Sequence, residues 1–201
     1  GELKLGESFS TKIGRQTIDY DDQRIMGSVG WAQQARNHDA ALLKYKKDKF
    51  MFDVGLAFNQ DKADLSGFSS VGTTYNTTGF FSYKTMQYAY LKQSWDVFSG
   101  SLLVLNNGFQ EYEANGTTPD GTSSLLTVGT HLGYKKGKLG LDSNLFIQTG
   151  QRQGRVDVKG AYLASLDLSL KASDKVALGA GVEIISGNDG AAGETGAFFP
   201  L

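Results

Sequence analysis

The chain has 201 residues, of which 26 are Gly, 2 are Pro and none is Cys, and its net charge is −1. This Gly share is nearly twice the usual ~7% and disfavours long helices, while the lack of Cys excludes disulfides, thiolate zinc sites and Cys nucleophiles. Because no surplus of cations is available to neutralise a phosphate backbone, general nucleic-acid binding is not expected. The longest nearly apolar run, Val176–Val182, is too short for a membrane-spanning helix.

Alternation of apolar and polar residues predicts ten strands. In chain order they cover residues 1–5, 8–18, 38–46, 49–60, 80–94, 96–109, 123–136, 138–150, 155–171 and 175–186. The clearest pattern is Val156–Leu170, where one parity is apolar except at Gly160 and the other is mostly polar. At ~3.3 Å per residue this strand is about 50 Å long. Strands in soluble proteins usually have only ~5 or 6 residues.

The connections between these strands alternate in length. Tight turns are predicted at Gly6–Glu7, Lys47–Asp48, Ser94–Asp96, Lys136–Gly137 and Ala172–Asp174. Most of the alternate gaps are long and cover residues 19–37, 61–79, 110–122 and 187–201. An antiparallel meander with one trimmed end and one end of long external loops is typical of outer-membrane barrels.

We therefore predict an all-β fold, an antiparallel transmembrane β-barrel meander that forms one unit over residues 1–201. The alternative is a soluble β-sandwich, whose strands alternate too. The chain begins inside a strand and shows no signal segment, so we expect an interior piece of a larger barrel. Missing strands or partner chains would have to close it in the lipid bilayer, since open sheet edges are not tolerated in hydrocarbon.

The segment Lys84–Lys92 carries a pattern typical of a membrane interface. Met86, Tyr88 and Tyr90 share one parity, with a Lys of the same parity at each end. We expect this stripe to face lipid and both lysines to extend toward the head groups.

Three motifs near the start of the chain resemble the alginate export family of outer-membrane porins. They are Gly-Arg-Gln at 14–16, Tyr-Asp-Asp-x-Arg at 20–24 and Trp-x-Gln-x-x-Arg-x-x-Asp at 31–39, and the closing Phe198–Leu201 is also similar. The resemblance implies a monomeric barrel of more than ten strands in the bacterial outer membrane, made with a signal peptide. It further implies a lumen that conducts anionic polysaccharide or small polar solutes.

Strand parity predicts the pore lining. The inward cations are Lys12, Lys44, Arg155 and Lys159, and the inward acids are Asp53, Asp142, Asp157, Asp167 and Glu183. Because this wall is mixed, it favours a porin over a dedicated exporter of polyanions. Arg15 has lipid-facing parity, which costs ~2 to 4 kcal/mol unless a bulge at Gly14 or a position near the rim relieves it.

Arg24 and Arg36 lie in the long segment 19–37 and are the candidates for a pore constriction. In the alternative interpretation they pair with Asp21, Asp22 or Asp39 and only fix the loop.

We found no pattern for catalysis, a metal or a cofactor. His38 and His131 lack a partner at metal-ligand spacing, and His131 is interpreted as a lumen residue rather than half of a Ser-His pair. Asp21–Asp22 could bind calcium, although solvated loop carboxylates are commoner. The sequence thus predicts a passive channel that is not an enzyme, with a structural or ligand-binding barrel or sandwich as the alternative.

Overall fold

The computed structural model describes residues 1–30, 36–59, 83–116, 118–188 and 193–200. Its regular elements are strands: β1 (Glu2–Lys4), β2 (Phe9–Gln16), β3 (His38–Lys47), β4 (Phe50–Phe58), β5 (Tyr83–Ser94), β6 (Phe98–Tyr112), β7 (Pro119–Lys136), β8 (Leu139–Arg152), β9 (Val156–Lys171), β10 (Ala177–Ile185) and β11 (Glu194–Thr195). Among the described residues, no helix is long and apolar enough to cross a membrane.

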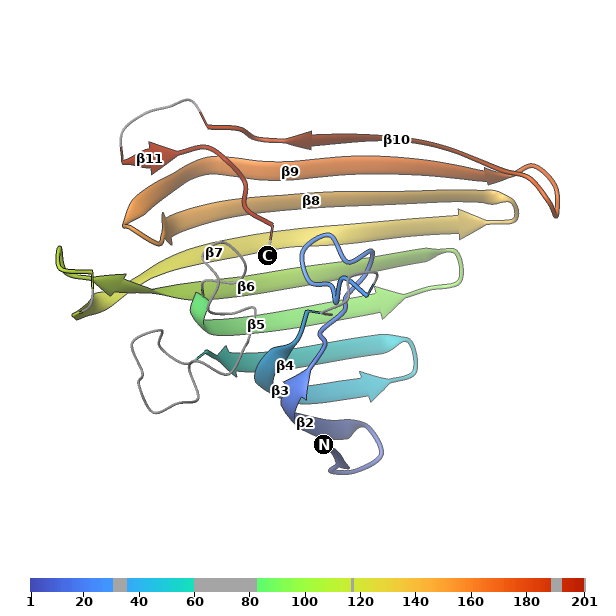
Figure 1. Ribbon diagram of the computed structural model, residues 1–201. Helices are drawn as coiled ribbons and strands as arrows, with labels where there is room; N and C mark the ends of the chain where they lie inside the picture. The colour runs from blue at the N-terminus through green and yellow to red at the C-terminus, as the bar shows by residue number, and fades with distance from the viewer. Residues whose placement is uncertain (31–35, 60–82, 117, 189–192, 201) are drawn as a thin grey trace.

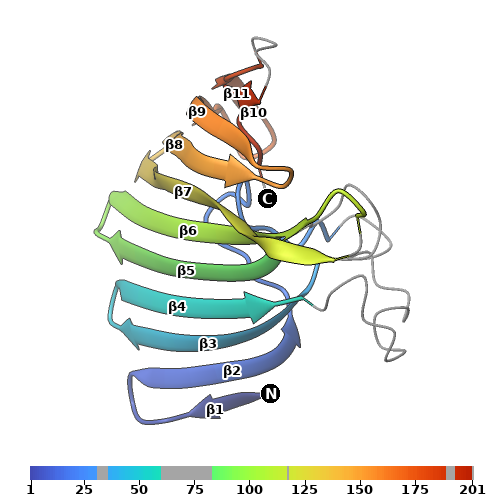
Figure 2. The same cartoon turned by 90° about the vertical axis from the view of Figure 1, so that its left-hand side faces the viewer.

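Strands β1 to β10 form one antiparallel meander in which each strand pairs with the next (Figure 1). β11 is the exception, since it pairs in parallel with β9 at Asp157 and Val158. The sheet is strongly curved and does not close, and β1 and β10 stand at its two edges (Figure 2). The all-β antiparallel meander predicted from the sequence is therefore confirmed, as an open sheet.

Two predicted connections differ from the structure. β6 runs to Tyr112 and β7 starts at Pro119, so the connection expected over residues 110–122 is mostly strand. The tail expected to be loop from residue 187 onward contains β11. The predicted loop 61–79 and the predicted strand start at residues 80–82 lie outside the described residues.

The two faces of the sheet differ in polarity. The convex face carries large apolar side chains that remain exposed, including Leu43, Leu56, Leu145, Leu166 and Val182. Many polar side chains of the concave face are buried, including Asp53, Ser101, Thr127, Asn144 and Ser165. The alternation predicted for Tyr162–Leu170 is confirmed, because its even-numbered aliphatics point to the convex side. An apolar exterior around a polar interior is typical of a membrane barrel.

A bulge at Gly160 reverses this alternation in the first part of β9. Gly160 has φ of 65°, and the β8–β9 register jumps from Gln148↔Ala161 to Gly150↔Val158. Both Val158 and Ala161 are buried, although they are an odd number of positions apart, namely three. Asp157 and Lys159 therefore lie on the outer face, and the prediction that they point inward was wrong, because one extra residue inverts every side chain beyond it.

The predicted lipid-facing stripe on β5 was also wrong. Asp53 lies opposite Tyr90, and Gly55 lies opposite Tyr88, so these tyrosines share the concave face with Asp53. Met86, Tyr88 and Tyr90 are buried there. Lys92 follows them inward, whereas Lys84 stacks over the exposed ring of Phe58.

Arg15 does face the outside, and the expected charge cost is relieved by a partner. The β2–β3 register is continuous through Gly14, so no bulge turns Arg15 inward. Its guanidinium instead donates to both carboxylate oxygens of Asp39, at 2.9 and 2.7 Å. Asp39 therefore pairs with Arg15, whereas Arg24 pairs with other carboxylates.

Candidate pore-lining face

The segment 17–30, here called the inward segment, lies against the concave face of the sheet (Figures 1 and 2). Ile18, Ile25 and Met26 are buried and form part of the apolar core. The segment is compact because Tyr20 N donates to Met26 O at 3.2 Å and Ser28 N donates to Asp19 Oδ1 at 2.5 Å. Met86, Tyr88 and Tyr90 face inward because this core gives them an apolar partner.

Tyr20 fixes one side of the inward segment to β4 and β5. Its hydroxyl donates to Asp53 Oδ2 at 2.7 Å and lies 3.1 Å from the Tyr88 hydroxyl. Its ring stacks on Tyr90 with centroids 3.9 Å apart. Burial, with Tyr88 and Asp53 nearby, raises the pKa of Tyr20, so its hydroxyl remains a donor at neutral pH.

Asp21 accepts three hydrogen bonds from the same side of the wall. Tyr90 Oη and Lys92 Nζ reach Oδ1 at 2.8 and 2.9 Å, and Ser101 Oγ reaches Oδ2 at 2.6 Å. Hydrogen bonds to an ionised carboxylate are stronger than hydrogen bonds between two neutral groups. Asp21 is thereby occupied, which leaves no basis for the calcium alternative at this residue.

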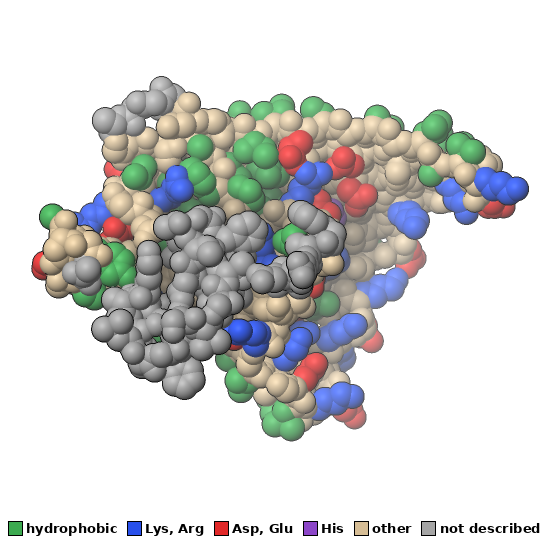
Figure 3. Space-filling view, in the orientation of Figure 1, with side chains coloured by type: hydrophobic (Ala, Val, Ile, Leu, Met, Phe, Trp, Pro, Cys, Tyr) green, Lys and Arg blue, Asp and Glu red, His purple; other side chains and the backbone are tan. Residues whose placement is uncertain are grey.

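Arg24 reaches the opposite side of the wall, on β9 and β10. Its guanidinium bonds to Asp22 at 2.9 Å and to Asp167 at 3.0 Å, and it also pairs with Glu183. Asn144 on β8 donates to the same Asp22 at 2.7 Å. Figure 3 shows the carboxylates of this region gathered on the concave face. The inward segment therefore bridges the curved sheet from β4 to β10.

Other predicted pore-lining residues share this face. Lys12 lies opposite buried Leu42, and Lys44 lies opposite Asp53. Asp142 lies opposite Asp167, which places two carboxylates side by side, and Glu183 follows on β10 opposite Ser165. Lysines thus cluster toward β2–β5, and carboxylates toward β8–β10.

Two predicted residues lie apart from this group. Arg155, at the β8–β9 turn, binds Asp120 at 2.6 Å and belongs to the long-loop end. The Arg36 amide donates to Ser28 O at 2.6 Å, which fixes the far end of the inward segment. Trp31 and Gln33 of the sequence motif lie outside the described residues.

His131 is a buried residue of the concave face. Its Nδ1 lies 3.0 Å from Asn144 Oδ1, and its Nε2 lies 3.6 Å from Asp142. Its cross-strand neighbour Ser101 donates to Asp21 instead. In the described part of the chain, no group of three or more His, Asp or Glu side chains is placed to hold a metal ion.

Residues 194–200, here called the C-terminal segment, also fold onto the concave face. The Gln148 side chain clamps Phe199 by donating to its carbonyl at 2.7 Å and accepting from its amide at 2.8 Å. The Arg152 guanidinium lies 3.4 Å from the centre of the Phe199 ring, and Phe198 is buried. The sequence pattern gave no sign of this contact.

The family model for alginate export matches residues 1–200. The chain belongs to the alginate export family. Members of this family are outer-membrane β-barrels that act as transport channels, and the curved antiparallel meander fits that architecture. Comparisons with curated proteins and with solved structures returned no match.

Proposed function

We propose that this chain forms part of the wall of a passive channel in the bacterial outer membrane. Polar solutes and anionic oligosaccharides would diffuse through this channel without a catalytic step. The observation that carries the proposal is the bridge across the concave face. Tyr20 and Asp21 bind one side of it and Arg24 binds the other, so the polar interior is narrowed by a segment of defined position.

The proposed constriction combines charges of both signs. Lys12, Lys44 and Lys92 line one side, and Asp142, Asp167 and Glu183 line the other, with Arg24 between them. Opposed charges of this kind create a transverse field that orients water and polar solutes without a strong preference for one sign. Short uronate oligomers would bind transiently on the lysine side.

Planar-bilayer recording of the intact protein tests the proposal. We expect stable ohmic current steps that uronate oligomers block from one side. Arg24→Gln should raise the conductance, because the bridge loses its bonds to Asp167 and Glu183, whereas Arg155→Gln, at the outer turn, should not. Absence of any current would contradict transport and favour a structural or ligand-binding barrel.

A further inference from the structure

Positive charge is concentrated at one end of the sheet. The short-turn rim, defined as residues 5–8, 46–49, 94–97, 135–138 and 171–175, contains eight Lys and four carboxylates. This surplus of four positive charges occurs in a chain whose net charge is −1. Figure 3 shows Lys and Arg side chains along this side of the molecule.

Most of these lysines have no carboxylate partner in the part of the chain that the structure describes. Lys49 pairs with Asp96 at 2.8 Å and Lys171 with Asp174 at 3.2 Å. Within the described residues, the other six form no ion pair: Lys46, Lys47, Lys135, Lys136, Lys138 and Lys175. At the long-loop end, by contrast, the exposed cations Arg15, Arg155 and Lys159 each bind a carboxylate. The rim lysines therefore remain available to an external anion.

Aromatic rings lie beside the rim lysines. Tyr45 packs between Phe9 and Phe50, and Trp95 packs on Phe98, with ring centroids 4.7 to 6.0 Å apart. Trp95 and Phe98 are exposed. Rings and lysines together at the end of an apolar face are typical of the level of lipid head groups.

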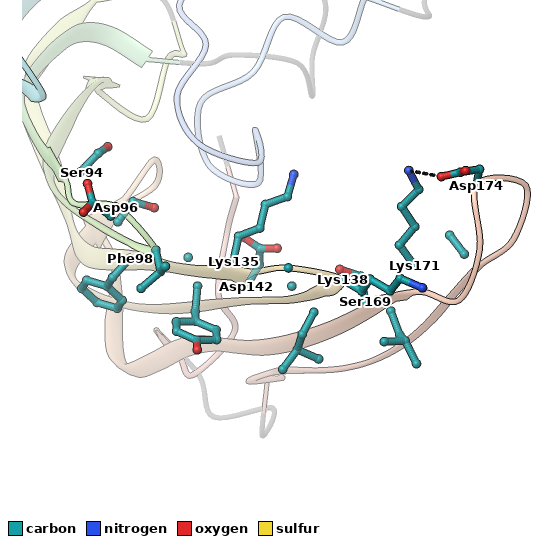
Figure 4. Close-up of a pocket in the computed structure, with 18 of the residues that line it drawn as sticks. Ser94, Asp96, Phe98, Lys135, Lys138, Asp142, Ser169, Lys171 and Asp174 are labelled. Atoms are coloured by element: carbon teal, nitrogen blue, oxygen red, sulfur yellow. Dashed lines mark ion pairs between the residues drawn. The ribbon is translucent and has the colours of Figure 1, made fainter.

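A hollow of about 700 Å³ lies along this rim between the β5–β6, β7–β8 and β9–β10 turns. Figure 4 shows Lys135 and Lys171 on one side of the strands and the Phe98 ring on the other. Lys138 and Lys175 lie in the turns, and Leu139 and Val176 add apolar surface. Of the three acids in the lining, Asp96 and Asp174 are paired with lysines, and Asp142 faces His131.

We infer that the rim at this hollow binds the phosphate group of an anionic phospholipid, with Lys138 and Lys175 of the two turns around the phosphate and the acyl chains along the convex face beside Phe98 and Leu139. This inference rests on the proposed membrane location. Apolar surface directly beside unpaired lysines fits an amphiphile, whereas a soluble acidic partner would need only the lysines. A lysine near an anionic surface favours binding by about fivefold.

Quenching of Trp95 fluorescence by brominated lipids tests the site. The intact protein is reconstituted with brominated phosphatidylglycerol or brominated phosphatidylcholine, and the signal lost in Trp95→Phe isolates the contribution of this residue. We expect phosphatidylglycerol to quench Trp95 with roughly 25-fold higher apparent affinity at low salt, because each of the two lysines contributes about fivefold. Replacing Lys138 and Lys175 with Gln should remove that preference.

The matched control replaces two lysines of the long-loop end, Lys84 and Lys159, with Gln and should keep the preference. Equal quenching by both lipids would overturn the phospholipid site but leave membrane insertion intact. Quenching by neither lipid would place Trp95 outside the bilayer and would count against the proposed channel as well. The two proposals therefore fail in different ways.

Discussion

The two sides of the concave face hold the inward segment by opposite chemistry. On β5 and β6, Tyr90, Lys92 and Ser101 donate to Asp21 of the segment. On β9 and β10, carboxylates accept from Arg24, only three residues further along. The charge pattern therefore favours the observed orientation, since reversing the segment would bring Asp21 toward the carboxylates of β9 and β10.

The two sides also differ in burial. Asp21 is 9% exposed and Tyr90 is 1% exposed, whereas Arg24 is 28% exposed and its partner Asp167 is 46% exposed. Exposed ion pairs contribute little and are screened by salt, while buried hydrogen bonds to a charged group contribute more. The tyrosine side is thus the stronger attachment, and the Arg24 side is the one that releases first.

Two glycines extend this comparison to the wall itself. Gly55 lies under the Tyr88 ring on one side, and Gly129 lies under the Phe146 ring on the other. Alanine at either position forces its ring to move, at a cost of about 1 to 3 kcal/mol. We expect Gly129→Ala to cost more in urea unfolding, because its Cβ also meets the Leu145 carbonyl. Equal costs would contradict this ranking.

Gly55→Ala should affect transport as well as stability, unlike Gly129→Ala. It displaces the Tyr88 ring that contacts Tyr20, so it should also change the single-channel conductance. Gly129→Ala serves as the control, because the ring that it displaces, Phe146, has no hydroxyl to bond to the inward segment, and its conductance should stay close to that of the wild type. A conductance change in Gly129→Ala alone would reverse the assignment of the two sides.

Tyr20→Phe should weaken the tyrosine side. Asp53 is buried, and in the described part of the chain its Oδ1 has no hydrogen-bond partner. Losing the Tyr20 hydroxyl removes the donor to its other oxygen, at a cost of about 1 to 3 kcal/mol in the free energy of unfolding. Tyr162→Phe, on the exposed convex face, is the control and should leave the urea midpoint unchanged.

The Arg24 side should respond to salt. At ~1 M salt the screening length falls to about 3 Å, so the bonds to Asp167 and Glu183 weaken. We expect the conductance to rise more steeply with salt than the bulk conductivity does. Replacing Asp167 with Asn and Glu183 with Gln should remove this excess, and an unchanged salt curve in that variant would show that Arg24 does not limit the passage.

The smallest expected effect is that of alkali on the tyrosine side. Folding raises the pKa of Tyr20, so the folded protein holds this proton more tightly than the unfolded chain does. Its stabilising contribution is complete below about pH 10 and is lost only as the pH rises toward the folded value. Conductance should therefore stay constant from neutral pH to about pH 10, and a step within that range would contradict a protonated Tyr20.

Sequence reasoning gave the meander and the outward face of β9 because both depend on local alternation. It failed at β5, where Tyr88 and Tyr90 pack against Ile25 and Met26 from a segment more than sixty residues earlier in the chain. It also failed at Lys159, because alternation marks Gly160 as a gap but does not reveal an extra residue there. The family motif included Tyr20 and Arg24, whereas their partners on β4, β9 and β10 depend on the tertiary fold.

The reversal at Gly160 divides β9 into two parts of opposite polarity. On the short-turn side of Gly160, β9 is apolar on its outer face and polar on its inner face, as a bilayer requires. On the long-loop side of Gly160, Val158 of β9 turns inward and Lys159 turns outward to Glu194, so the outer face of the strand is polar there. We therefore expect the first residues of β9, Val156–Lys159, to lie outside the hydrocarbon layer. Labels or peptide tags attached at Lys159 should be accessible from the medium without disturbing the lipid-embedded part.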